Sequence, residues 1–161
     1  MKLDHDSSLD QDARDLHKAL SELVRVYQFR DRTRICYYDV SVTQCYALAQ
    51  LVTAGPTNLN HLAGALFLDK STASRVVDSL VRKGYTRRRP DPDDSRAVKL
   101  LATAKGRRLH RQIESDLEEE MRLMLTDYDH DVRQATSSLI ARLARAAKQR
   151  FSSKNSPETP A

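Results

Sequence analysis

The clearest structural signal in the sequence is the segment Asp69-Lys70-Ser71-Thr72-Ala73-Ser74-Arg75-Val76-Val77-Asp78-Ser79-Leu80-Val81-Arg82-Lys83-Gly84. Asp69 is a residue type that caps the start of a helix, and Gly84 is a type that ends one. Between them, apolar residues recur at the spacing of one helix face. The first turns carry small polar and basic side chains instead. The stretch therefore predicts an amphipathic helix with one buried face and a polar N-terminal end.

The residues before this helix predict two further helices. One carries Leu59, Leu62, Ala63 and Leu66, with Thr57 as its expected N-cap. It is separated from the helix after Asp69 by only a few residues, which is the arrangement of a helix-turn-helix. The other begins at the capping-box pair Ser41 and Gln44 and ends at Gly55-Pro56.

A β-hairpin is expected after Gly84. The runs 85–89 and 97–101 are short and compatible with extended backbone, and the segment 90–96 between them is rich in Pro, Asp and Ser. The sequence therefore predicts two antiparallel strands joined by a long tip.

Longer helices flank this central part. Apolar stripes predict one helix over residues 9–34, a second that Thr103 caps, and a third after a break at 127–131. Residues 151–161 are expected to be a disordered tail. The three stripes are too apolar for a lone helix-turn-helix and must be buried, either against a second copy or in a monomeric core.

Composition bounds the class of protein. The chain has 161 residues, about one domain, of which 40% are hydrophobic and 30% charged. Its few Gly and Pro residues indicate a mostly helical fold. The polar N-terminus, the lack of a long apolar run and the presence of only two cysteines lead us to expect a cytoplasmic protein with no membrane span and no disulfide framework.

Charge is concentrated in the middle of the chain. Residues 70–111 hold thirteen Lys or Arg and four Asp, a local net charge of +9 in a chain whose net charge is +5. The ends are correspondingly acidic. This distribution suggests that the middle segment faces a polyanion.

These patterns together resemble one known family. The residues that carry the resemblance are Ser41-x-x-Gln44, Leu62-Ala63, Asp69 to Gly84, Arg89-x-Asp91-Pro92-x-Asp94-x-Arg96 and Thr103-x-x-Gly106. They are similar to the MarR family of bacterial transcription regulators over roughly residues 9–150. The resemblance implies a mainly α fold with a small β-wing: a winged helix-turn-helix of six helices and a two- to three-stranded antiparallel sheet, in an interlocked dimer.

The resemblance also implies a division of the single domain, 1–161. Residues 41–101 would form the DNA-binding lobe, and residues 9–37 and 104–150 would supply the dimerisation helices. A two-fold dimer of this kind reads a palindromic operator in double-stranded DNA.

The helix after Asp69 is the expected recognition helix. Small polar side chains at its start can hydrogen-bond phosphates or base edges, and Arg75 can contact guanine through two hydrogen bonds. The alternative is that Ser71 and Thr72 only stabilise the start of the helix. The expected DNA-binding residues here are Lys70, Ser71, Thr72, Ser74 and Arg75.

The hairpin is the expected wing. Arg87, Arg88 and Arg89 would lie on a strand beside the duplex, unless they are only a solvated run of charge. The resemblance implies that Arg96 enters the minor groove and that Asp94 orients it. Ser95 stands where a second Arg is common in the family.

The two thiols are candidate sensors. The family places its effector pocket between the first, second and fifth helices, and Cys36 and Cys45 fall near that junction, with Tyr37, Tyr38 and Tyr46 close in sequence. A small-molecule, redox or thiophilic-metalloid signal could act there. The alternative is that both cysteines are small buried hydrophobic residues.

The predicted function is a sequence-specific regulator that a signal releases from DNA. A repressor is the favoured form, and the resemblance also allows an activator. The sequence contains no catalytic motif and no cofactor motif, and its five His residues are not at metal-ligand spacing, so we expect no enzyme, cofactor or metal. Two alternatives remain: a small hydrolase or transferase that uses the cysteines, and an architectural winged-helix protein that binds DNA or protein partners without an effector.

Overall fold

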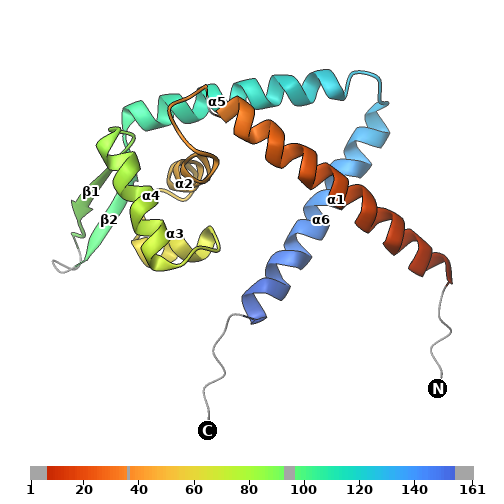
Figure 1. Ribbon diagram of the computed structural model, residues 1–161, viewed down its shortest axis with the longest axis horizontal. Helices are drawn as coiled ribbons and strands as arrows, with labels where there is room; N and C mark the ends of the chain where they lie inside the picture. Colours follow the sequence, from red (N-terminus) through yellow and green to blue (C-terminus); the bar gives the residue numbers. More distant parts are fainter. Residues whose placement is uncertain (1–6, 36, 93–96, 155–161) are drawn as a thin grey trace, which may run out of the picture. The chain divides into compact units, whose positions relative to one another are not determined.

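The computed structural model describes residues 7–35, 37–92 and 97–154, with side chains over 8–28, 37–92 and 97–150. Its elements follow the expected order of three helices, a recognition-type helix, a hairpin and two long helices (Figure 1). They are α1 (Ser7–Ile35), α2 (Val42–Thr53), α3 (Leu59–Ala65), α4 (Lys70–Arg82), β1 (Thr86–Pro90), β2 (Val98–Ala102), α5 (Ala104–Met124) and α6 (His130–Lys154). The predicted fold of six helices and a two- to three-stranded antiparallel sheet is confirmed, and the described sheet has two strands.

The helix starts follow local sequence signals. Ser41 caps α2 in a complete capping box with Gln44, and Asp69 caps α4, both as predicted. The expectation that Thr57 caps α3 is wrong, because Asn58 does so by accepting a hydrogen bond from the His61 N–H at 2.8 Å. Thr57 instead pairs with Leu100 in an isolated antiparallel bridge.

The hairpin has a continuous register from Thr86 opposite Ala102 to Pro90 opposite Val98. Its distal end is held by the Asp91 N–H, which donates to the Ala97 carbonyl at 2.9 Å, and by an ion pair of 2.8 Å between Lys99 and Asp91. The bridge at Thr57 attaches the segment before α3 to β2. The hairpin is therefore closed by its own contacts at the distal end, and the bridge at Thr57 attaches it to the helical part of its lobe.

The core lies where α2, α3, α4, β2 and the first half of α5 meet. Its most enclosed large side chains are Leu48, Leu51, Leu62, Val77, Leu80, Leu100 and Ile113, each at most 2% exposed. At one point the packing is backbone to backbone: a Cβ placed on Gly106 would lie 2.1 Å from the Tyr85 carbonyl oxygen. The α5 helix can therefore lie against the start of β1 only because residue 106 has no side chain.

The remaining apolar stripes stay at the surface of the single chain. Packing divides the chain into two units, one ending at Ser115 and the other beginning at Asp116. In the first, α1 leaves Leu16, Leu23 and Val24 exposed, and in the second, α6 leaves Leu139 and Ile140 exposed. No helix in the described ranges is long and apolar enough to span a membrane.

The expectation of a disordered tail from residue 151 is wrong at its start. The α6 helix continues to Lys154. Residues 155–161 of the expected tail lie outside the described residues.

Candidate nucleic-acid interface

The α4 helix has one buried face and one basic face. Ala73, Val77 and Leu80 recur at helical spacing and are buried in the core. On the opposite side, Ser71, Arg75 and Arg82 form a single exposed row, because residues three, four and seven apart share a helix face. Lys70 is also exposed, whereas Thr72 and Ser74 are half-buried. The basic row is therefore held on a rigid, well-packed helix.

The N-terminal end of α4 is organised around the carboxylate of Asp69. This group accepts hydrogen bonds from the Ser71 hydroxyl at 2.6 Å, the Thr72 hydroxyl at 2.6 Å and the Thr72 N–H at 2.8 Å. The hydrogen bond from the Ser71 side chain, followed by those from Thr72, holds the pKa of Asp69 well below its ordinary value. In the free protein both hydroxyls therefore donate to the cap, as the helix-start alternative expected, and offer lone pairs outward.

The three arginines of β1 divide between two faces of the strand. Thr86 is buried and Arg88 points to the same side, since side chains alternate along a strand. There, Arg88 Nη2 lies 2.6 Å from Asp78 Oδ1 on α4. Arg87 and Arg89 occupy the other side and are exposed, with no ion pair to any described carboxylate. Two of the three side chains are thus available to an outside anion.

Two predicted wing residues, Asp94 and Arg96, lie outside the described residues. The structure does place the strands that flank them, and β1 is joined to α4 by the ion pair between Arg88 and Asp78. Arg82 was missed by the sequence analysis. Its signal was the spacing of seven residues from Arg75, which places both side chains on one helix face.

The predicted sensor residues that the structure describes differ in exposure. Cys45 is 8% exposed and packs in the core side of α2, whereas the neighbouring Tyr46 is 53% exposed. Tyr37 is exposed and Tyr38 half-buried, and Cys36 lies outside the described residues. Among the residues whose positions are given, no three His, Cys, Asp or Glu form a metal-type cluster.

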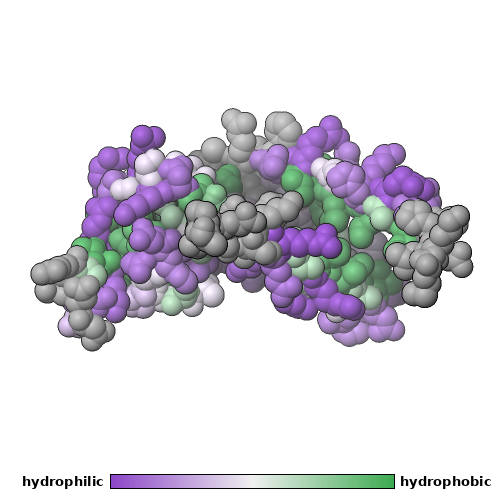
Figure 2. Space-filling view, turned by 90° about the horizontal axis from the view of Figure 1, so that it is seen from below, coloured by the Kyte–Doolittle hydropathy of each residue, from purple (hydrophilic) through white to green (hydrophobic). Residues whose placement is uncertain are grey.

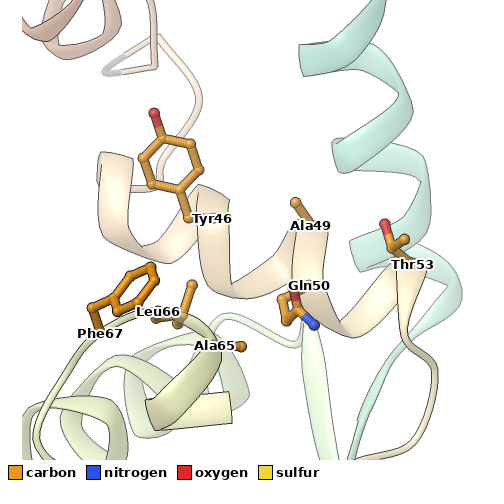
Figure 3. Close-up of a pocket in the computed structure, with 7 residues that line it drawn as sticks. All are labelled: Tyr46, Ala49, Gln50, Thr53, Ala65, Leu66 and Phe67. Carbon is orange, nitrogen blue, oxygen red and sulfur yellow. The ribbon is translucent and has the colours of Figure 1, made fainter. Parts of the chain in front are cut away.

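An open hollow does lie between α2 and the turn after α3 (Figure 3). Its volume is about 500 Å³, and its lining contains no acidic or basic residue. The lining residues are Tyr46, Ala49, Gln50, Thr53, Ala65, Leu66 and Phe67. Phe67 is 60% exposed and has a φ of 53°, a left-handed conformation that is costly for a bulky side chain.

Comparison with known proteins finds similarity to MarR family regulators in the central part of the chain. Residues 40–98 match the sequence model of the MarR family. The HTH-type transcriptional regulator YsmB of Bacillus subtilis is 23% identical over 114 residues, which are 71% of this chain and 78% of that protein. The multiple antibiotic resistance protein MarR of Salmonella typhimurium is 30% identical over 92 residues. That match spans 55% of this chain and 64% of that protein, just under two thirds.

The fold agrees with solved structures over most of the chain. A MarR family protein from Bacillus stearothermophilus superimposes with a TM-score of 0.79, covering 86% of this chain and 96% of that one at 20% identity. The matched sequence segment contains α2 to β1, which carry the basic row and the outward arginines. Residues 40–98 therefore carry the sequence pattern of the MarR family, and most of the chain has the fold of a solved MarR family protein.

Proposed function

We propose that the chain is a repressor that binds a palindromic operator as a homodimer, with α4 in the major groove and the wing along the adjacent backbone. The observation that carries this proposal is the exposed row Ser71, Arg75 and Arg82 on α4 beside the outward Arg87 and Arg89 of β1. A dimer bound at a promoter would exclude the transcription machinery from it.

The α4 helix would supply base readout. Arg75 projects directly away from the buried face, and a guanidinium can donate two hydrogen bonds to the O6 and N7 of guanine. Ser71 and Thr72 donate to Asp69, so in that state they can accept from the amino groups of cytosine or adenine. Lys70 and Ser74 lie within the same two turns and would contact phosphates or base edges.

The wing would supply affinity. Arg87 and Arg89 would neutralise phosphates, whereas Arg88 would act through its ion pair with Asp78. Following the family resemblance, Arg96 would enter the minor groove, with Asp94 as its partner.

The exposed stripes support a homodimer. Figure 2 shows hydrophobic side chains reaching the surface amid hydrophilic ones, and α1 and α6 contribute Leu23, Val24, Leu139 and Ile140 to the exposed set. Apolar surface of this extent is typical of an interface rather than of a monomer in water. Two copies related by a two-fold axis would present two α4 helices to one duplex.

A signal would release the operator, and the hollow beside α2 is our candidate for its site. Two exposed aromatic rings, Tyr46 and Phe67, and the amide of Gln50 suit a small uncharged aromatic molecule. Leu66 and Phe67 begin the turn that leads to Asp69, so a ligand there would contact the segment that positions α4.

A thiol-reactive signal is the second candidate, and the burial of Cys45 favours packing over sensing at that residue. Treating wild type, Cys36→Ser and Cys45→Ser with peroxide, diamide or arsenite separates the two. Release that is lost in one variant would identify a sensor thiol, whereas identical behaviour of all three would leave the hollow as the site.

The proposal is tested by selecting duplexes from a random library with the wild-type protein. We expect the selected duplexes to share a two-fold symmetric consensus sequence. The protein should bind this sequence about a thousandfold or more tighter than a shuffled duplex of equal length. Binding without any sequence preference would instead support an architectural winged-helix protein.

A further inference from the structure

A partly buried polar connection joins the start of α2 to the far end of α4. The Gln44 side-chain amide donates to the Ser79 hydroxyl at 2.9 Å, across 35 residues of sequence. Its oxygen accepts from the Ser41 N–H and from Lys83 Nζ, both at 3.2 Å. The Gln44 side chain therefore completes the α2 cap and also hydrogen-bonds to Ser79 and Lys83 at the end of α4.

Lys83 extends this connection to the turn between α1 and α2. Its ammonium group donates to the Asp39 carbonyl oxygen and lies 3.3 Å from Asp39 Oδ1. With a side chain only 27% exposed, Lys83 is shielded more than a typical surface lysine. The turn that follows α1 is thus attached to the C-cap residue of α4.

The α5 helix holds the same end of α4 from another side. Lys105 Nζ donates to the Lys83 carbonyl at 2.9 Å, and the Thr103 hydroxyl donates to the Gly84 carbonyl at 2.7 Å. Unsatisfied carbonyls at a helix C-terminus are where cations and hydroxyl donors stabilise most. The end of α4 away from its polar N-terminus is therefore fixed to the turn before α2 and to the start of α5.

From this arrangement we infer that Gln44 is a positioning residue for DNA recognition: through Ser79 and Lys83 it fixes the direction in which α4 leaves the lobe. This inference rests on the proposed function, in which α1 forms part of the dimer interface. If α1 is fixed to the partner copy, the clamp of Asp39, Gln44, Ser79 and Lys83 fixes the separation and angle of the two α4 helices. Its specific consequence is a sharp preference for one half-site spacing.

The main test variant is Ser79→Ala, which removes the α2–α4 hydrogen bond and leaves the capping box of α2 intact. Gln44→Leu removes all three side-chain contacts, including the half of the capping box that Gln44 Oε1 supplies, and keeps the hydrogen bond from the Gln44 N–H to the Ser41 hydroxyl. Gln44→Glu is the conservative variant, since a carboxylate can accept from the Ser41 N–H, Lys83 Nζ and the Ser79 hydroxyl together. Ser115→Ala on the exposed side of α5 is the matched control.

The measurement is the affinity of each variant for the selected duplex and for duplexes whose half-site spacing is one base pair longer or shorter. Ser79→Ala and Gln44→Leu are expected to lose about five- to tenfold in affinity at the selected spacing, and to lose proportionally less at the altered spacings. Gln44→Glu and Ser115→Ala are expected to keep the wild-type preference. Circular-dichroism melting and sedimentation of the same samples show whether fold and dimer persist.

A uniform loss at all spacings, matching a lower melting temperature, would assign the clamp a structural role only and overturn the inference. Unchanged affinities in a folded Ser79→Ala dimer would overturn it as well. Should the wild-type protein itself show no spacing preference, the proposed palindromic readout fails first. The wild-type measurement therefore separates the two failures.

Discussion

Arg88 on β1 and Asp78 on α4 form an ion pair of 2.6 Å, with both side chains a little over 40% exposed. This contact joins the wing strand to the helix proposed to read DNA. It also distinguishes Arg88 from its neighbours Arg87 and Arg89, which face away from α4. Three consecutive arginines therefore have two different roles.

The wing arginines should differ in the salt dependence of DNA binding. Arg87→Ala and Arg89→Ala each remove a phosphate contact, so the slope of log affinity against log salt should become shallower by about 0.9 per variant. Arg88→Ala should leave the slope nearly unchanged and match Asp78→Asn in its effect on affinity. Titration by fluorescence anisotropy at several salt concentrations measures the slopes. Equal slope changes for all three arginines would contradict the assignment of phosphate contacts to Arg87 and Arg89 and of a structural ion pair to Arg88.

Arg75→Ala should weaken binding to the selected duplex by about 1–3 kcal/mol and leave binding to a shuffled duplex nearly unchanged, because a base contact is lost. Arg111→Ala, an exposed arginine on α5, serves as the control for charge alone. An equal loss on both duplexes would show that Arg75 contacts only the backbone.

Two glycines in helices should respond in opposite directions to alanine. Gly106→Ala places a Cβ 2.1 Å from the Tyr85 carbonyl oxygen, so α5 and β1 must separate, at a cost of about 3 kcal/mol in the free energy of unfolding. Gly64→Ala meets nothing within 4 Å and should stabilise α3 by about 0.5–1 kcal/mol. Thermal melting at one fixed protein concentration gives both values. A tolerated Gly106→Ala would mean that the two backbones are not packed so closely.

Thr86→Val should stabilise the protein by about 1 kcal/mol. Thr86 is 2% exposed, and its hydroxyl is buried with no hydrogen-bond partner among the described groups. Valine keeps the shape and removes the polar atom, which relieves a desolvation cost. Thr86→Ser, which keeps the hydroxyl and loses a methyl group, should destabilise instead. A destabilising Thr86→Val in urea titrations would indicate that the hydroxyl has a partner.

The α4 cap should make stability depend on pH in the acid range. Because the pKa of Asp69 is lowered in the folded state, its stabilising contribution is present above the ordinary Asp pKa of about 3.9 and is lost as the pH falls towards the folded value. Asp69→Asn keeps a cap but cannot titrate. The stability difference between wild type and this variant should be constant above about pH 5 and shrink below pH 4. Asp12→Asn on α1 is the control, and a difference independent of pH would contradict the role of Asp69.

Local signals predicted much of this fold. The capping pair Ser41 and Gln44, the Asp69 cap and the stop at Gly84, with its φ of 75°, each depend on a few adjacent residues, and all were predicted. The α3 cap was assigned to the wrong residue because Thr57 and Asn58 are both capping types. Thr57 is not the cap because its backbone pairs with that of Leu100, which is distant in the sequence.

The contacts that distinguish individual site residues could not be read from the sequence. Arg88 differs from Arg87 only because of strand alternation and the rotation of α4, which bring it to Asp78. The bond from Gln44 to Ser79 depends on how α2 crosses α4. The run of arginines predicts contacts with an anion, and the capping box predicts the start of a helix. Which arginine pairs with Asp78, and that Gln44 also binds Ser79, depends on how separate elements pack together.

If two copies of α4 read one duplex symmetrically, hydroxyl-radical footprinting of the wild-type protein on the selected duplex should show two protected regions. These regions should be related by two-fold symmetry and lie about one helical turn or a multiple of it apart. Arg75→Ala should weaken both regions equally. A single unsymmetrical region, or even protection along the whole duplex, would contradict the account.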